Sequence, residues 1–272
     1  MRPVCSLAAG RTGRILQLPG DVQQLLPLAQ PCDGVAQQPR HTHLRGVQLL
    51  GDLAGHERDA EQLGVRTGDR GRGASAPVVP GLPHGEVSLT VAGIELSYDA
   101  RVFFQAHRGL LGALVERVVG EETGETAYDL YSGVGLFSLP LARRYERVVA
   151  VEADRIAARY CRNNARRNKL PGVETVNRSV ESWVEELPKD APRVVVDPPR
   201  SGLPAVVRRT LTARPPRRLT YVSCHAATLA RDLKALTRRF TLDELTLFDL
   251  FPQTGHMEAV VQMTRVEQED AG

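Results

Sequence analysis

The sequence predicts an α/β protein built on a doubly wound, mostly parallel sheet of seven strands with an antiparallel last strand, a Rossmann-like arrangement. From residue 86 onward, short apolar runs alternate with helix-like segments, and such βα repeats form parallel sheets with right-handed crossovers. A glycine-rich turn, "DLYSGVGLF" (129–137), joins the first of these runs to a helix. Two consecutive apolar runs, 241–251 and 256–264, close the chain, and their short link requires antiparallel pairing.

The regular part opens with a hairpin and a helix. Residues 87–99 alternate around Ala92-Gly93, which is typical of two strands joined by a tight turn. Apolar residues between Leu110 and Val118 share one face of a predicted helix over 107–119. The remaining elements are strands at 126–132, 147–153, 173–177, 193–199 and 218–224, and helices at 136–144, 154–168, 179–186, 204–213 and 226–238.

The chain divides near residue 86 into parts of different composition. Residues 1–85 are rich in Gln, Gly, Arg and Pro, and 66–85 has the Gly and Pro punctuation of a linker. We assign 1–85 to an N-terminal region, a partial domain and linker, for which no fold is predicted. Residues 86–120 are the hairpin and helix that lead into a second domain, which covers 121–272.

The composition indicates which cellular compartment and which kinds of partner to expect. With 272 residues, 42% of them hydrophobic, the chain can bury a sizeable core. Its charge of +3 rests mainly on arginine, which favours an anionic partner. The cysteines form no CxxC pair, which argues against zinc and a disulfide framework and favours a reducing cytoplasm. No run reaches the roughly 18 apolar residues of a membrane span, so neither a signal peptide nor a membrane partner is predicted, and a monomer is favoured.

A nucleotide-like cofactor is predicted at the glycine-rich turn. Gly133 and Gly135 let the backbone turn sharply and approach a ligand closely. Glu152 ends the next strand, 17 residues after Gly135, where an acidic side chain can accept hydrogen bonds from ribose hydroxyls. Nicotinamide enzymes share this layout. Ser138 at the third small position, and the Asp-Pro-Pro that ends the strand at 193–199, favour S-adenosylmethionine instead. Asp197 there is a helix cap or turn residue in the plain interpretation, but the abrupt end of the apolar strand favours a ligand site.

Two further residues are candidates for catalysis. Cys224 follows a strand and precedes a helix, so nearby backbone N–H groups and the positive helix end should lower its pKa. The alternative is a small buried residue, which is how we interpret Cys161. Glu258 interrupts an apolar strand and is either paired, protonated or functional, or else faces outward from an edge strand.

These motifs together resemble the RNA 5-methyluridine (uracil-C5) methyltransferases, which modify uridines in transfer and ribosomal RNA. The resemblance covers about 87–265 and rests on five motifs in order: "FFQAH" (103–107), "DLYSGVGLFSLPLA" (129–142), "DPPRSGL" (197–203), "SCHAATLARDL" (223–233) and "DLFPQTGHMEAV" (249–260).

The resemblance implies a class I methyltransferase fold, S-adenosylmethionine as cofactor and RNA as partner. Cys224 would be the nucleophile and Glu258 the acid that removes a proton. Cofactor contacts would come from Gln105, Tyr131, Glu152 and Asp197. Many members also carry an N-terminal RNA-binding barrel and an iron–sulfur cluster. Cys5 and Cys32 cannot supply four ligands, so no cluster is predicted, and the chain is expected to be a member whose N-terminus is either shortened or degraded.

The chain departs from the family pattern at four positions. His225 and Ala226 stand where members often have Asn and Pro, Leu136 replaces an Asn in the glycine turn, and His107 another Asn. The alternatives are a cytosine-5 methyltransferase, an amino-directed methyltransferase, or a non-catalytic RNA-binding protein that keeps the fold. Amino-directed enzymes usually show an aromatic residue where this chain has Arg200, and they need no cysteine.

Overall fold

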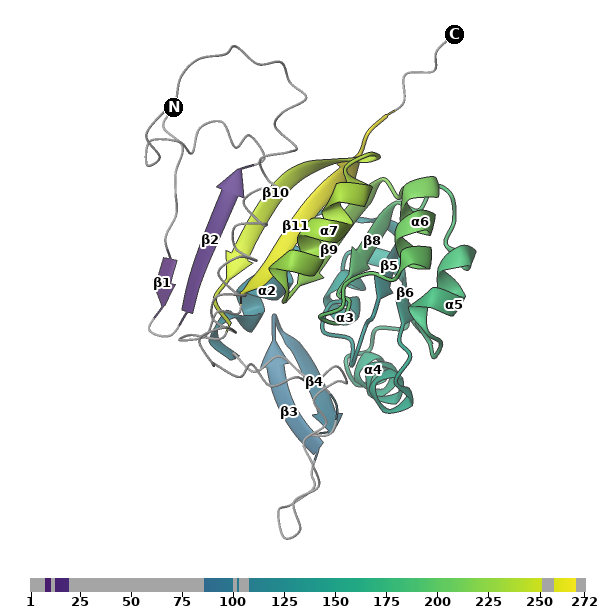
Figure 1. Ribbon diagram of the computed structural model, residues 1–272. Helices are drawn as coiled ribbons and strands as arrows, with labels where there is room; N and C mark the ends of the chain where they lie inside the picture. The colour runs from purple at the N-terminus through teal and green to yellow at the C-terminus, as the bar shows by residue number, and fades with distance from the viewer. Residues whose placement is uncertain are drawn as a thin grey trace, which may run out of the picture.

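The structure is a computed structural model that describes residues 8–10, 13–19, 86–99, 102, 108–250 and 257–267. The described residues form a nine-stranded sheet and a separate two-stranded hairpin. The large sheet has the strand order β1-β2-β10-β11-β9-β8-β5-β6-β7 (Figure 1). Its strands are β1 Ala8–Gly10, β2 Gly13–Pro19, β5 Gly124–Leu130, β6 Tyr145–Val151, β7 Val173–Val176, β8 Arg193–Val196, β9 Arg218–Ser223, β10 Phe240–Phe248 and β11 Glu258–Arg265.

Seven of these strands, β5 to β11, confirm the predicted doubly wound sheet. β7, β6, β5, β8 and β9 pair in parallel. The last strand, β11, pairs antiparallel with both β9 and β10, as expected from the short link between the final runs. Two strands that were not predicted extend the sheet, because β2 pairs antiparallel with β10 and β1 with β2. A short stretch of the N-terminal region therefore continues the sheet beyond β10.

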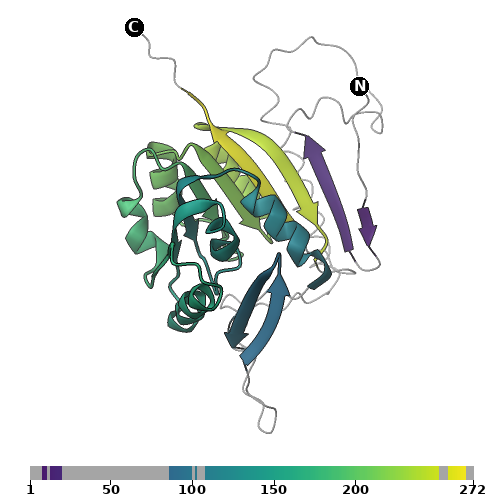
Figure 2. The ribbon, with the colours of Figure 1, turned by 180° about the vertical axis from the view of Figure 1, so that it is seen from behind.

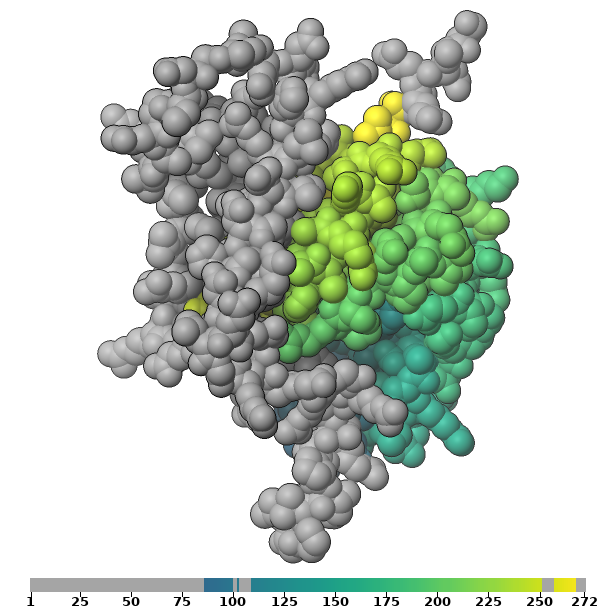
Figure 3. Space-filling model, viewed as in Figure 1, coloured from purple at the N-terminus to yellow at the C-terminus, as the bar shows by residue number. Residues whose placement is uncertain are grey.

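Helices cover both faces of the sheet. On one face lie α5 (Val180–Trp183), the 3₁₀ turn η3 (Val184–Glu186), α6 (Ala205–Ala213) and α7 (Ala226–Leu236). On the other lie α2 (Arg108–Val119), α3 (Ser138–Leu141) and α4 (Arg155–Arg167). Figures 1 and 2 view the two faces in turn, and Figure 3 shows the outer surface of the face on which α6 and α7 lie. None of these described helices is long and apolar enough to cross a membrane.

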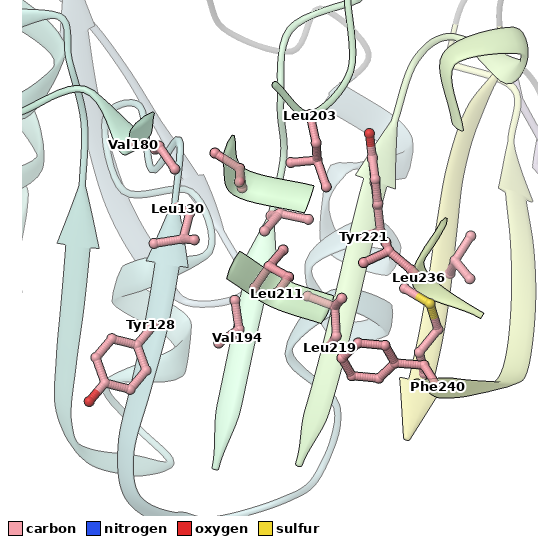
Figure 4. Close-up of a cluster of buried hydrophobic side chains, with 14 of the residues drawn as sticks. Tyr128, Leu130, Val180, Val194, Leu203, Leu211, Leu219, Tyr221, Leu236 and Phe240 are labelled. Carbon is pink, nitrogen blue, oxygen red and sulfur yellow. The ribbon is translucent and has the colours of Figure 1, made fainter. Parts of the chain in front are cut away.

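The core lies on both sides of the parallel strands. Successive strand side chains point to opposite faces, so Leu130 and Val194 pack beneath α6, whereas Ala127 and Val195 pack beneath α2 and α3. Figure 4 shows the first of these clusters, with Tyr221 between the sheet and α7. Burial on both faces explains the continuous apolar runs of the sequence. Because ligands of open α/β sheets bind beyond the carboxyl ends of the strands, that edge is where a site is expected.

A hairpin of β3 (Glu86–Val91) and β4 (Ile94–Asp99) confirms the predicted pair of strands. Its two turn residues, Ala92 and Gly93, have positive φ angles of 48° and 72°. Two-residue hairpin turns with positive φ angles at both positions match the right-handed twist of the flanking strands. The guanidinium of Arg143 donates to both turn carbonyls, at 3.0 and 2.7 Å, so the tip of the hairpin is held against the residues that follow α3.

Two asparagines, Asn164 within α4 and Asn168 at its C-cap, hold the hairpin by pairing with its backbone as a neighbouring strand would. The Asn164 side chain accepts a hydrogen bond from the Ser97 N–H (3.0 Å) and donates to the Ser97 carbonyl (2.9 Å). Asn168 does the same with Glu95, at 3.0 and 2.7 Å. Asn164 also donates to the carbonyl of Val134 in the glycine turn, at 3.1 Å. The hairpin, α4 and the glycine turn are thus one connected unit.

The helix predicted over 136–144 is wrong in its length, since α3 covers only Ser138–Leu141. Residues 133–137 form a turn instead. Gly133 and Gly135 take positive φ angles, which an α-helix cannot contain. The apolar spacing that suggested a longer helix belongs to side chains that anchor this turn to the core.

Candidate active site

The turn after β5 leaves the ordinary backbone regions at three positions. Tyr131, Gly133 and Gly135 have φ angles of 68°, 55° and 97°. A Cβ on Gly135 would lie 2.2 Å from Leu139 Cδ1 and 3.1 Å from Cys161 Sγ, so glycine is needed there for the turn to pack on α3 and α4. A Cβ on Gly133 would meet nothing within 4 Å. Gly133 therefore borders open space at the carboxyl end of β5.

Tyr131 presents a polar group that the described residues do not satisfy. Its hydroxyl is buried and has no hydrogen-bond partner among them. Burial raises the pKa of this phenol above its usual value. Tyr131 also holds a left-handed backbone conformation, which is strained for a residue with a side chain. Such strain and an orphaned hydroxyl are features that cluster at ligand sites.

Glu152 fastens the glycine turn to the start of α4. One carboxylate oxygen accepts from the Gly133 N–H at 2.8 Å, and the other accepts from the Asp154 N–H at 2.7 Å. Asp154 in turn caps α4, accepting from the N–H groups of Ile156 and Ala157. Burial is the largest influence on Glu152 and raises its pKa, against backbone hydrogen bonds from Asp154, Gly133 and Ala153 that lower it. Glu152 thus shapes the turn itself, besides any contact with a ligand.

Three carboxyl groups meet at the ends of neighbouring strands β5, β6 and β8. Burial raises the pKa of Asp129 to about 7, opposed by a hydrogen bond from the Ser138 hydroxyl and reinforced by Glu152. Asp197 has a raised pKa because it is buried and close to both other acids. It caps no helix, since Pro204 is at the N-cap of α6. Mutually repelling buried carboxyls favour a bound cation.

Asp129 was missed by the sequence interpretation. It lies within β5, where residues 127–130 are all buried, and one of its oxygens has no hydrogen-bond partner among the described residues. The sequence feature that could have identified Asp129 is an acidic residue within a strand that is otherwise apolar on both faces.

The register of the sheet brings the two catalytic candidates together. Ser223 at the end of β9 lies opposite Ala259 of β11, so the next positions along the two strands are Cys224 and Glu258. The Glu258 side chain is in the interior, with the residue only 1% exposed. The alternative of an outward-facing edge position is wrong, because β11 lies between β9 and β10.

The expected lowering of the Cys224 pKa is not what the structure shows. Burial, then the charges of Glu258 and Asp197, raise the pKa of this thiol to about 12, and only Arg200 opposes them appreciably by charge. The influence of the helix end is outweighed because Cys224 stands before α7 beside two carboxyls. At neutral pH the thiol is therefore protonated until a substrate changes its surroundings.

His225 has a structural role at the start of α7 and does not simply face the solvent. It is the N-cap of α7, where its Nδ1 accepts from the Thr228 N–H at 3.3 Å. The Thr228 hydroxyl donates to the Arg200 carbonyl at 3.0 Å. The residues after Cys224 thus start a helix and hold the loop that follows Asp197.

Asp232 connects the "DPPRSGL" and "SCHAATLARDL" motifs. This fully buried carboxylate accepts from the Leu203 N–H (2.7 Å), the Tyr221 hydroxyl (2.8 Å), Arg208 (3.1 Å) and Arg231 (2.9 Å). The loop after Asp197 is therefore pinned to α7 through one acidic side chain.

We expect Asp232→Ala to cost about 3–5 kcal/mol of unfolding free energy, because it leaves the partly buried Arg208 and the buried donors of Leu203 and Tyr221 without their acceptor. Urea unfolding measures this. Asp190→Ala is the matched control, since Asp190 also binds two arginines, Arg217 and Arg265, but its side chain is 52% exposed. The control should lose at most about 1 kcal/mol. Equal losses in the two variants would contradict the assignment of Asp232 as the anchor.

The structure places most of the predicted site residues at one edge of the sheet. The cofactor candidates Tyr131, Gly133, Gly135 and Glu152 follow β5 and β6, and Asp197 follows β8. Asp197 is near enough to Cys224 to shift its pKa, and so links the cofactor candidates to the catalytic pair. Gln105 lies outside the described residues, as do Cys5 and Cys32.

The fold is an open, doubly wound α/β sheet, and its polar cluster lies beyond the carboxyl ends of the strands. A putative S-adenosylmethionine-dependent methyltransferase from Streptococcus mutans shares this fold, with a TM-score of 0.54 at 14% identity over 68% of this chain and 56% of that one. The profile of the tRNA (uracil-5-)-methyltransferase family matches residues 88–266. The chain belongs to that family, and the resemblance seen in its motifs is confirmed.

Individual relatives agree with this assignment. The 23S rRNA (uracil(1939)-C(5))-methyltransferase RlmD of Pectobacterium carotovorum is 36% identical over 65% of this chain and 41% of its own length. An uncharacterized RNA methyltransferase of Thermotoga maritima is 34% identical over 60% and 38%. The tRNA (uracil-54, C5)-methyltransferase of Pyrococcus abyssi, solved with S-adenosyl-L-homocysteine, has a TM-score of 0.60 and 30% identity over 66% of this chain and 44% of that one. The chain spans about two fifths of the length of these curated relatives.

Proposed function

We propose that this chain transfers a methyl group from S-adenosylmethionine to carbon 5 of a uridine in ribosomal or transfer RNA, through a covalent adduct of Cys224. The observation that carries the proposal is the strand register that sets Cys224 against the buried Glu258, beside Asp197. Membership of the uracil-5-methyltransferase family supports the choice of base and atom. A cytoplasmic location stays a prediction, as does the absence of an iron–sulfur cluster.

The residues at the carboxyl edge suit the proposed cofactor. Gly133 leaves open space in front of the turn, and Tyr131 offers an unsatisfied hydroxyl. The carboxyls of Asp129, Glu152 and Asp197 suit a positively charged ligand. When bound, S-adenosylmethionine supplies an electrophilic methyl group on a sulfonium. Tyr131, Gly133, Gly135, Glu152 and Asp197 would hold it, together with Gln105 as the family resemblance implies.

The chemistry of uracil explains why a thiol and a carboxylate are both needed. Carbon 5 of uracil is a poor nucleophile. Attack of the Cys224 thiolate on carbon 6 forms a carbon–sulfur bond and leaves enolate character at carbon 5, which can then accept a methyl group. Glu258 would then remove the proton left on carbon 5. The 5,6 double bond re-forms as the carbon–sulfur bond breaks and the thiolate leaves.

The protonation state of Cys224 determines when the thiolate forms relative to the binding of RNA and cofactor. In the unliganded protein the pKa of the thiol is about 12, because burial and the nearby carboxyls favour the neutral form. We therefore place thiolate formation after the RNA base and the cationic cofactor have entered. The target base must leave its stack to reach the half-buried Cys224 and the buried Glu258.

The proposal is tested by incubating the protein with S-adenosylmethionine labelled in its methyl group. The RNA is total ribosomal and transfer RNA from a strain that lacks the gene, and nucleosides from the digested RNA are separated by mass spectrometry. We expect label in 5-methyluridine. Label in 5-methylcytidine or in an amino-methylated base would contradict the choice of base, and an unlabelled RNA would contradict the enzymatic function.

A further inference from the structure

One face of α4 carries a line of cations. Arg155, Arg159, Arg162, Arg166 and Lys169 recur at spacings of four and three residues, which place side chains on the same side of a helix. All five are exposed. We call this set the α4 stripe. Over the helical part of the stripe, from Arg155 to Arg166, the rise is about 16 Å.

The stripe borders two adjoining hollows, which together we call the groove. Arg155, Arg159 and Arg162 line one hollow, and Arg162, Arg166 and Lys169 line the next, so that Arg162 is common to both. Glu174 is the acidic residue of the second hollow, and it is paired with Arg147 on the neighbouring strand.

The charges of the stripe are not balanced within the described part of the chain. None of the five forms an ion pair there. Asp154 is an acidic N-cap, but the first turn of α4 itself contains no acid and begins with Arg155, a cation at the positive end of the helix. Cations three and four residues apart also repel one another. The charges of the stripe therefore destabilise α4, which suggests that they serve a function other than folding.

We propose that the α4 stripe binds the phosphate backbone of the RNA substrate; the inference rests on the function proposed above. Arginine suits phosphate through its paired donors. The stripe begins next to the site, because Asp154, which precedes Arg155, donates its N–H to Glu152. β6, which leads into α4, lies three strands from β9, which ends before Cys224, a separation of about 14 Å. RNA flanking a uridine at Cys224 can reach the stripe.

A membrane surface is the competing anionic partner, and the burial of α4 argues against it. A helix that binds lipid inserts its apolar face into the headgroup region. The apolar face of α4 is already occupied, since Ala157, Ala158, Tyr160, Cys161 and Ala165 are buried in the domain. Only the charged face is available, which suits a polyanion that lies along a groove.

The test compares two triple variants of the full chain that lose the same charge. Arg159→Gln/Arg162→Gln/Arg166→Gln removes the middle of the stripe. Arg209→Gln/Lys234→Gln/Arg238→Gln removes three exposed cations on and next to α6 and α7, on the opposite face of the sheet. Binding of bulk transfer RNA is measured by fluorescence anisotropy between 50 and 300 mM salt, a range chosen because phosphate contacts are salt-dependent. Vesicles of phosphatidylglycerol and phosphatidylcholine serve as the second probe.

The stripe variant should bind transfer RNA on the order of 10²-fold more weakly at 0.1 M salt, because each lost phosphate contact contributes about 0.7–0.9 to the slope of log K against log salt. The slope should fall by about 2–3. The control variant should change affinity by less than about threefold, since its charges are screened from the groove. Thermal unfolding should show no loss of stability in the stripe variant, because glutamine is also a good helix former and repulsion is relieved.

The outcomes separate the inference from the proposed function. Equal weakening in both triple variants, or unchanged RNA affinity in the stripe variant, would overturn the stripe as an RNA surface while methylation of uridine could still stand. Loss of vesicle binding with RNA binding retained would assign the stripe to a membrane and also overturn it. Failure of the unsubstituted protein to bind any RNA would count against the proposed function as well.

Discussion

Replacement of Cys224 by alanine is expected to abolish methyl transfer to uridine and to prevent covalent trapping by RNA that contains 5-fluorouridine. Without the thiolate, carbon 5 gains no enolate character, so turnover should fall by at least about 10³-fold. With 5-fluorouridine the unsubstituted protein should be trapped, because fluorine at carbon 5 cannot be removed as a proton. The adduct is measured as a shift of labelled RNA on a denaturing gel in the presence of S-adenosylmethionine.

Cys161→Ala is the matched control for this experiment. Cys161 is the other cysteine of the described chain, and it is fully buried on the far side of the glycine turn. Its variant should still form the adduct with 5-fluorouridine RNA. Methylation by Cys224→Ala at the unsubstituted rate would show that another group activates the base, and the nucleophile assignment would then be wrong.

Glu258→Gln is expected to separate the two halves of the reaction. The glutamine amide cannot take the proton from carbon 5, so the methylated adduct should accumulate on ordinary RNA and turnover should fall about 10²–10⁴-fold. The gel assay described for Cys224 detects the adduct, here without fluorine. Release of 5-methyluridine at the unsubstituted rate would remove Glu258 from this role.

The same substitution should make Cys224 more reactive in the free protein. The Glu258 charge is the second cause, after burial, of a thiol pKa of about 12. Removing that charge lowers the pKa, so alkylation by iodoacetamide at pH 8 should be faster in Glu258→Gln, and in both proteins the rate should rise about tenfold per pH unit below the pKa. Peptide mass spectrometry assigns the alkylated cysteine. Glu244→Gln, on the neighbouring strand β10, is the control and should leave the rate unchanged; slower alkylation in Glu258→Gln would contradict the charge effect.

The order of elements could be predicted because it depends on local pattern. Apolar runs buried on both faces and the short final link were enough to place β5 to β11. β2 could not be predicted, since its partner β10 lies more than 200 residues further along the chain and nothing local marks the pairing. The early end of α3 was missed because the positive φ angles of the glycine turn override the apolar spacing.

The sequence predicted which residues belong to the candidate site better than it predicted their pKa values. Motif order identified Cys224, Glu258, Asp197 and Glu152, which depend on residue type and spacing. The pKa of Cys224 was predicted in the wrong direction, because the two carboxyls that raise it come from β8 and β11, which are distant in sequence. Asp129 was overlooked because its burial is a property of the assembled sheet.

The pairing of β2 with β10 bears on how this protein can be handled in the laboratory. The family match starts at residue 88, and trimming the chain there would remove β2. Five β10 positions, Glu244 to Phe248, would lose their strand partners. An open row of backbone donors and acceptors recruits strands from other molecules. A trimmed protein is therefore expected to self-associate through β10 even with every site residue intact. Any loss of activity in that protein would then be caused by aggregation and not by a defect in the catalytic residues.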